Sequence, residues 1–153
     1  MVIVLFLVFV GVTQFSNNGV ANFRYDKKVN EPSAELKKDP AKAEYVKKNI
    51  TLASIGTLDE IEAGSPTPTK YIYGTIKNNG DKRIIKLQLT VYYFDKGGKL
   101  IAEGSIWPIL GNKAKLDSIK PDSSRDFQFL VTGTVPGWSG KIRAKVSDVE
   151  FAD

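Results

Sequence analysis

The chain has 153 residues, 42% of them hydrophobic and 25% charged, which is the composition of a folded domain and not of a disordered chain. Its length suffices for one well-buried domain and is too short for two large ones. Cysteine and histidine are both absent, which excludes disulfides, thiol nucleophiles, imidazole bases and the usual zinc and haem ligands. The net charge of +5 fits a lysine-rich solvated surface, and we expect no nucleic-acid partner.

Residues 1–15 form an apolar segment, and no charged side chain occurs before Arg24. As a helix this segment would extend about 22 Å, against a hydrocarbon core about 30 Å thick, so polar residues 16–23 or a thinner bilayer would have to make up the difference. We expect a hydrophobic helix that anchors the chain in the lipid bilayer. A cleaved signal segment is the alternative, with Gly19-Val20-Ala21 as its small-residue cleavage site.

Residues 16–49 predict a polar connector with short helices, similar to a stalk. Ser33 is a suitable N-cap for one helical turn, and Asp39-Pro40 is a cap followed by proline at the first helical position. Glu44 and Lys48 stand four residues apart in the order that favours an ion pair. The many lysines here could attract anionic lipid headgroups, but the acidic residues mixed among them favour ordinary solvated helix faces.

Residues 50–153 predict an antiparallel β-sandwich domain of about seven short strands. The strongest signal is the run 85–93, in which apolar residues alternate with more polar ones at the two-residue period of a sheet. Further strands are expected at 50–55 and 70–77, and in three stretches with the same alternation. In the first of these, Leu100, Ala102, Gly104 and Ile106 share one face, and Trp107-Pro108 ends the strand. In the second the alternating residues are Phe127, Phe129 and Val131, and in the third they are Ile142, Ala144 and Val146.

Turn residues separate these strands. The loop 57–69 is rich in glycine and proline, Asn78–Asp81 predicts a hairpin, and Asp95–Gly98 predicts a second one. The alternation slips by one residue at Ser147-Asp148, which predicts a β-bulge in the last strand.

The second half of the chain resembles the FxLYD family of immunoglobulin-like domains and, more loosely, the late-embryogenesis-abundant type 2 sandwiches. The resemblance lies in the order of a strand with G-x-[VI]-x-N, an aromatic-D-x-x-G-[KR]-[LVI] turn, and a later strand in which proline precedes Phe-x-Phe. The matching residues are Gly74, Ile76, Asn78, Phe94, Asp95, Gly98, Lys99, Leu100, Pro121, Phe127 and Phe129.

The resemblance implies a bacterial, envelope-exposed binding or structural module without catalytic residues. We therefore expect an extracytoplasmic β domain, in the periplasm or at the cell surface. The basic residues point the other way, because Arg24, Lys27 and Lys28 follow the apolar segment and none precedes it, which taken literally places the domain in the cytoplasm. A translation start upstream of Met1 that adds a basic flank would remove this conflict.

We expect a non-enzymatic accessory or structural subunit of a membrane protein complex, with no cofactor, metal or small-molecule substrate. Its partner is expected on the wetter face of the β domain and at tryptophans beside Pro108 and Pro136, because aromatic residues favour interfaces. The candidate partner-binding residues are Tyr71, Tyr73, Lys86, Gln88, Tyr92, Trp107 and Trp138.

Two alternatives remain open. Tyr71, Tyr73 and Tyr92 with nearby lysines and Arg83 could form the stacking platform of an OB-like barrel that binds nucleic acid or another polyanion. A hydrolase could instead use carboxylates alone, although none is spaced as a motif. The candidates for such carboxylates are Asp59, Glu60, Glu62, Asp95 and Glu103.

Overall fold

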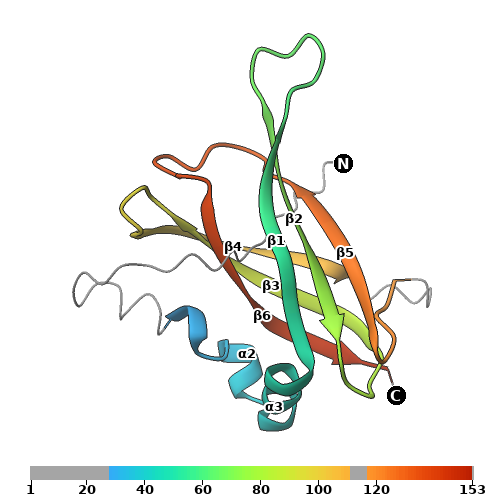
Figure 1. Ribbon diagram of the computed structural model, residues 1–153. Coiled ribbons are helices and arrows are strands. Elements are labelled where there is room, and N and C mark those ends of the chain that lie inside the picture. Colours follow the sequence, from blue (N-terminus) through green and yellow to red (C-terminus); the bar gives the residue numbers. More distant parts are fainter. Residues whose placement is uncertain (1–27, 111–116, 153) are drawn as a thin grey trace.

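The computed structural model describes residues 28–110 and 117–152, and this part of the chain is an all-β fold of two antiparallel sheets preceded by short helices (Figure 1). The hydrophobic helix expected over residues 1–15 lies outside the described residues. No helix within the described ranges has the length and apolar character needed to cross a bilayer. The elements are α2 (Ala34–Lys37), α3 (Pro40–Asn49), β1 (Ile50–Glu60), β2 (Thr69–Asn78), β3 (Ile84–Phe94), β4 (Leu100–Leu110), β5 (Ser123–Leu130) and β6 (Lys141–Phe151).

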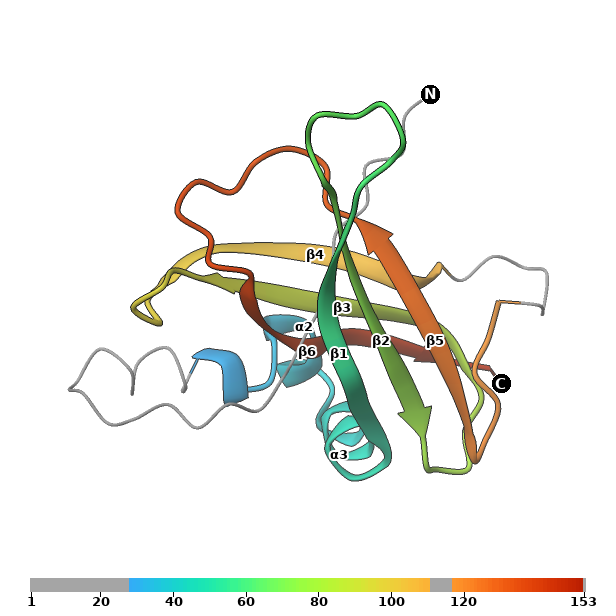
Figure 2. The same cartoon turned by 45° about the horizontal axis from the view of Figure 1, so that its top comes forward.

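The strands form two three-stranded sheets. Sheet A has the order β1-β2-β5 and sheet B the order β4-β3-β6. Figure 2 shows the strands of sheet B running across those of sheet A as a second layer. Ile72 and Ile76 of sheet A and Leu87, Leu89 and Val91 of sheet B are fully buried in one shared core, so the sheets pack face to face through their apolar sides.

The expected hairpin at Asn78–Asp81 is wrong, because this turn leads from one sheet to the other. β2 pairs with β1 and β5, whereas β3 pairs with β4 and β6. The expected turn at Asp95–Gly98 does join two paired strands, β3 and β4, and Gly98 has the positive φ of 81° that such a turn requires. Turn residues therefore predicted where the chain reverses but not which strands pair.

Two strands are longer than predicted, and the described residues form six strands where about seven were expected. β1 continues to Glu60 through residues that we assigned to a loop. β4 continues through Trp107-Pro108 to Leu110, with a register shift at this point. Proline is tolerated there because β4 is an edge strand and the shift interrupts its ladder.

The predicted bulge in β6 is confirmed. Gln88 pairs with Asp148 and Leu89 with Val146, which leaves Ser147 as the extra residue and restores Val149 to the core. A similar shift between Tyr93 and Phe94 moves Leu100 to the outer face of sheet B. The prediction that Leu100 shares one face with Ala102, Gly104 and Ile106 is therefore wrong.

Both predicted helix caps are confirmed. The side chains of Ser33 and Asp39 accept hydrogen bonds from the N–H groups of Leu36 and Lys42, at 3.2 and 3.1 Å, and Pro40 is the first residue of α3. The predicted ion pair from Lys48 to Glu44 is present at 2.6 Å.

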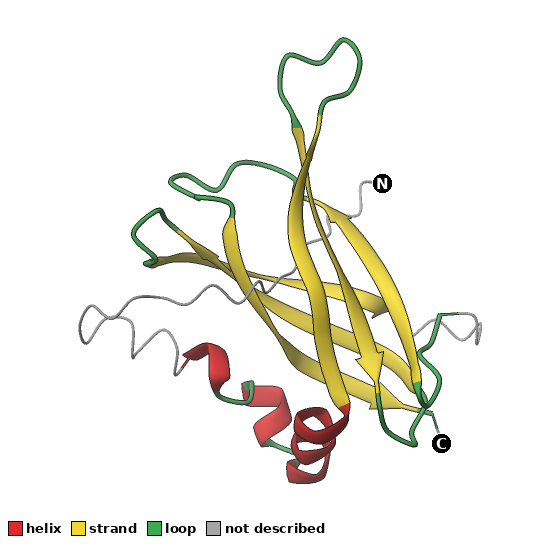
Figure 3. Cartoon of the chain, in the orientation of Figure 1, coloured by secondary structure: helices red, strands yellow, loops and turns green. Residues whose placement is uncertain are grey.

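The helices lie together beside the ends of β1 and β6 (Figure 3) and close the open side between the two sheets. Leu36 is buried in the shared core, and Val46 packs against that core. The Ser33 hydroxyl also donates to the Ser147 carbonyl. Residues 34–49 are therefore part of the folded unit and not a free-standing stalk.

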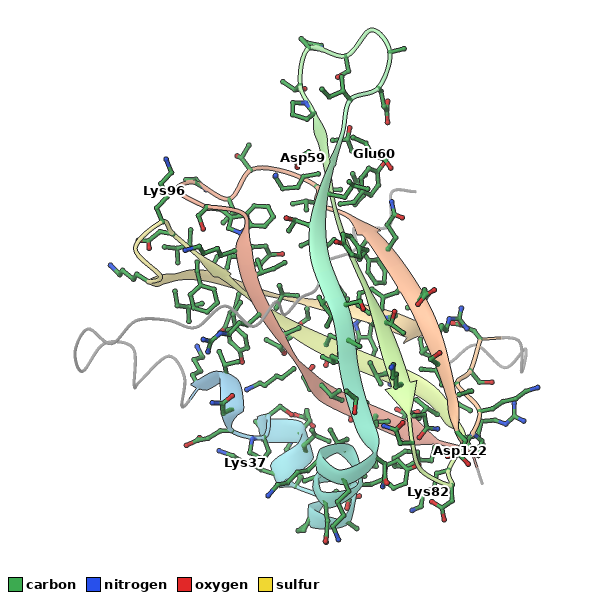
Figure 4. The ribbon with its side chains drawn as sticks, viewed as in Figure 1. Lys37, Asp59, Glu60, Lys82, Lys96 and Asp122 are labelled. Carbon is green, nitrogen blue, oxygen red and sulfur yellow. The ribbon has the colours of Figure 1, made fainter. Side chains whose placement is uncertain are left out.

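The amide of Asn78 joins three separate parts of the chain and is itself only 1% exposed. Its nitrogen donates to the carbonyls of Lys82 and Lys120, at 2.7 and 3.1 Å. Its oxygen accepts from the Tyr45 hydroxyl of α3 at 3.1 Å and from the N–H of Gly80 at 3.3 Å. Lys82 lies at the far end of this turn, near Asp122 at the start of β5 (Figure 4). The amide thus satisfies the buried backbone groups of the crossover and attaches α3 to it.

Replacing Asn78 by Ala should lower the free energy of unfolding by about 2–4 kcal/mol, because it removes four hydrogen bonds of a buried amide. The Lys82 and Lys120 carbonyls would each keep one partner, from Tyr45 and Ser123. Asn79→Ala is the matched control. Among the described residues the exposed Asn79 amide bonds one side chain, that of Thr51 at 3.3 Å, and surface substitutions change stability by about 0.5 kcal/mol. Urea unfolding of both variants measures the difference. Equal stabilities for the two would contradict the role given to Asn78.

Candidate functional site

The predicted partner-binding residues do not share one face. Because β2 and β3 belong to opposite sheets, Tyr71 and Tyr73 lie on the outer side of sheet A, away from the outer side of sheet B. Trp138 lies in the segment between β5 and β6. The single wetter face that we expected from a β2–β3 hairpin is therefore wrong. The residues that fall on the outer side of sheet B are Lys86, Gln88, Tyr92 and Trp107.

Tyr92 is buried, with 2% of its surface exposed, so its predicted place on an exposed face is wrong. It packs with Val29 and Phe94, and the Lys145 ammonium lies 5.3 Å from the centre of its ring. Burial, with a smaller contribution from Glu103, raises the pKa of Tyr92 to about 12. Val29, which lies far upstream in the sequence, thus packs against the outer face of sheet B at Tyr92.

Lys86, Trp107 and Gln88 are engaged within sheet B. The Lys86 ammonium lies 2.7 Å from the Glu150 carboxylate and 4.9 Å from the centre of the Trp107 ring. The hydrogen bond with Glu150 is the main cause that raises the pKa of Lys86. Gln88 accepts a hydrogen bond of 3.3 Å from the bulged residue Ser147. These contacts stabilise the pairing of the strands and the bulge.

Trp138 closes one end of the core. Its ring meets the Tyr93 ring edge-on, with 5.2 Å between centres, and its N–H donates to the Lys141 carbonyl at 2.9 Å. Lys70 lies over the same ring at 5.3 Å. Trp138 therefore has a structural role in the sandwich.

The outer side of sheet A carries a continuous apolar row. Tyr71 pairs with Leu58 on β1 and with Leu130 on β5, so these three side chains stand next to one another across the sheet. We call Leu58, Tyr71 and Leu130 the apolar row. Leu58 and Leu130 are 43% and 41% exposed, and Tyr73, two residues from Tyr71 on the same face, is also 41% exposed. Large side chains in register and open to solvent are typical of an interaction surface.

A hollow of about 500 Å³ lies beside Tyr73, and its polar lining residues are Ser54, Thr75, Asp126 and Gln128. Its shape arises from a register shift in β1 at Ser54, which has a positive φ of 49°. The Tyr73 ring lies so close to Gly56 that a β-carbon there would overlap its hydroxyl, and the Thr75 hydroxyl donates to Asp126 at 2.6 Å. Sheet A thus offers an apolar row next to a polar hollow.

Sequence reasoning identified Tyr71 and Tyr73 but missed Leu58 and Leu130. Leu58 was hidden because residues 57–60 looked like a loop. Leu130 could have been found, since it stands in the outward phase of the strand in which Phe127 and Phe129 face the core.

The carboxylates proposed for a hydrolase have other contacts or lie apart. Asp59 forms an ion pair with Lys70, and Glu103 pairs with Lys28 at 2.7 Å. Asp95 accepts from the N–H of Lys99 in the β3–β4 turn at 2.9 Å. Figure 4 shows Glu60 beside Asp59, where β1 leads into its terminal loop. In the described ranges no three acidic side chains are grouped closely enough to hold a metal ion.

The platform imagined for a polyanion is also divided. Tyr71 and Tyr73 face outward from sheet A, Lys86 lies on sheet B, and Tyr92 is buried. Their arrangement does not place aromatic rings and basic side chains along one groove.

No model of a known protein family matches the chain, and neither a curated protein nor a solved structure gives a match. The resemblance to FxLYD-type domains stays a prediction.

The buried Tyr93 predicts how stability depends on pH. Burial raises its pKa from 10.0 to about 12. Between these values the unfolded chain loses the phenol proton while the folded chain keeps it, so stability present below pH 10 is lost as pH rises toward 12. Tyr93 alone should account for a loss of about 1.4 kcal/mol between pH 9 and pH 11.

Urea unfolding at these two pH values, in the native chain and in Tyr93→Phe, measures this contribution. The Phe variant keeps the ring beside Trp138 and should lose less stability on going to pH 11. An equal loss in both proteins would contradict the assignment.

Proposed function

We propose that the chain is a non-enzymatic, membrane-anchored envelope protein, an accessory or structural subunit that binds a larger membrane protein assembly through its β-sandwich. Residues 1–15 anchor it in the bilayer, and the β domain lies on the extracytoplasmic side. The observation that carries this proposal is the apolar row on sheet A, exposed on a domain whose other sheet is partly covered by its own chain.

The composition of the surface supports a protein as the partner. The row joins two aliphatic side chains to Tyr71, with Tyr73 beside it, and aromatic residues are enriched in protein interfaces while lysine and glutamate are depleted from their centres. Polar groups in the adjacent hollow, Asp126 and Gln128, can accept or donate hydrogen bonds at the edge of such a contact. A partner that buries the row would remove apolar surface from water without unfolding any part of the domain.

The position of the tether supports sheet A as the binding face. The first described residues lie on sheet B, where Lys28 pairs with Glu103 and Val29 packs on Tyr92. Residues 28 and 29 therefore occupy the outer side of sheet B, while the described residues leave Leu58 and Leu130 on sheet A exposed to a partner.

The strand order supports an immunoglobulin-like domain, as in the FxLYD resemblance. In that fold a sheet containing strands A, B and E faces one containing C′, C and F, and the chain passes between sheets from B to C. Here β1-β2-β5 face β4-β3-β6, and the crossing occurs between β2 and β3. We infer that β1 to β6 correspond to A, B, C, C′, E and F.

Placing Asp at both Leu58 and Leu130 should release the partner, because two charges would be buried at the centre of the contact. The full chain, tagged at its C-terminus and gently solubilised from membranes, should migrate with a larger assembly, and the double variant should migrate at the monomer size with at least tenfold less partner recovered.

Leu110→Asp is the matched control, since Leu110 is an exposed leucine, 57% accessible, at the end of sheet B. It should leave the assembly intact. Monomer-sized migration of the native chain, or equal release by Leu110→Asp, would sink the proposal. Thermal unfolding of each variant checks that the domain stays folded.

The extracytoplasmic placement predicts that an added protease cleaves the β domain in cells whose cytoplasmic membrane is intact. Cleavage of an exposed loop, such as residues 61–68 between β1 and β2, should remove the C-terminal tag. A cytoplasmic protein serves as the control for membrane integrity. Cleavage seen only after lysis would place the domain in the cytoplasm. That is the location predicted by the basic residues that follow the apolar segment.

A further inference from the structure

A pocket of about 580 Å³ lies between the helical connector and β6, away from the apolar row. This volume is in the range of small-molecule sites in proteins. Most of its lining is apolar and comes from three separate segments of the chain, so the site exists only in the folded domain. The apolar residues of the lining are Val29, Pro32, Leu36, Ala43, Val46 and Val146.

Lysines surround this apolar lining. Lys47 and Lys48 come from the last turn of α3, and Lys145 comes from β6. The Lys48 ammonium pairs with Glu44 at 2.6 Å, and the other acidic residue of the lining, Glu31, pairs with Lys37 at 3.2 Å. Lys37 is the last residue of α2 and is labelled in Figure 4. The carboxylates of the pocket are thus engaged by Lys48 and Lys37, while Lys47 and Lys145 bring further positive charge.

The Lys145 ammonium lies over the Tyr92 ring, and the carboxylates of Glu103 and Glu31 are near enough to act on its charge. The same ammonium donates to the main-chain carbonyls of Lys28 and Glu31, at 2.7 and 3.0 Å. Burial lowers the pKa of Lys145, an effect that Glu103 and Glu31 partly offset. A fixed, partly dehydrated cation next to an apolar cavity is a suitable partner for an anion that arrives with an apolar tail.

We propose that this pocket binds a single acyl chain with an anionic head, its tail against Leu36, Val46 and Val146 and its head between Lys47 and Lys145. The tail gains from leaving water, as each methylene does in an apolar site. The same chemistry is offered by a free fatty acid and by one chain of an anionic phospholipid. The apolar residues 1–15 of the chain itself fit less well, because they carry no negative charge for the lysines.

The test uses the full chain in nanodiscs of zwitterionic lipid, to which palmitate with a photoreactive group in its tail is added. After illumination, mass spectrometry should locate the adducts in residues 34–48 and 141–151. Excess palmitate should compete, and hexadecanol should compete at least tenfold more weakly because it lacks the charge. A second set of nanodiscs with photoreactive phosphatidylglycerol shows whether the anionic lipid is the better source of the chain.

Lys47→Glu should reduce labelling by palmitate about tenfold, because it reverses an exposed charge at the head position. Lys42→Glu is the matched control: it makes the same charge change on the same helix outside the pocket and should leave labelling unchanged. Ala43→Phe should also abolish labelling by filling the cavity, provided that thermal unfolding shows a folded domain. If it does not fold, Lys47→Glu still decides.

Three outcomes would overturn the proposal. These are no adducts in the pocket segments with either probe, adducts confined to residues 1–15, and pocket labelling that Lys47→Glu leaves as strong as Lys42→Glu does.

Discussion

The fold depends on one buried amide, that of Asn78. A chain that passes from one sheet to the other must turn away from its ladder, and its backbone carbonyls then lack partners within either sheet. Asn78 supplies those partners at the crossover and before β5, while its oxygen accepts from α3 and from the turn itself. Because one side chain forms hydrogen bonds with all of these groups, it links the connector helix, the crossover and sheet A in a single arrangement.

This crossover also determines which side chains lie on the outer face of each sheet. By sending β2 and β3 into different sheets, it separates Tyr71 and Tyr73 from the polar side chains of β3. Sheet B then receives Val29 and the carbonyls that Lys145 binds, whereas the row Leu58, Tyr71 and Leu130 on sheet A stays exposed. The two proposed sites follow from this asymmetry: a protein surface on sheet A, and an acyl pocket where the connector meets β6.

The sequence was sufficient for local features and insufficient for long-range ones. Alternation located the inner faces of the strands, side-chain oxygens at Ser33 and Asp39 located the caps, and the slip of phase located the bulge at Ser147. Periodicity, however, reports which residues alternate and not which strands pair, so the β2–β3 hairpin was wrong. Tyr92 stands in an outward phase, and its burial depends on a residue more than sixty positions earlier, for which no local pattern exists. Leu58 was missed for a similar reason, since only pairing with β2 extends β1 beyond residue 55.

The bonds that hold the connector to β6 give the domain a direction of mechanical strength. Tension applied at residue 28 would reach sheet B through the Lys28–Glu103 ion pair, the two hydrogen bonds of the Lys145 ammonium and the hydrogen bond from Ser33 to the Ser147 carbonyl. These side-chain contacts would carry load before the strand ladders do, so residues 28–33 would separate from sheet B while both sheets stay paired. Because residues 29–32 also line the pocket beside β6, their separation would open that pocket while the domain stays folded.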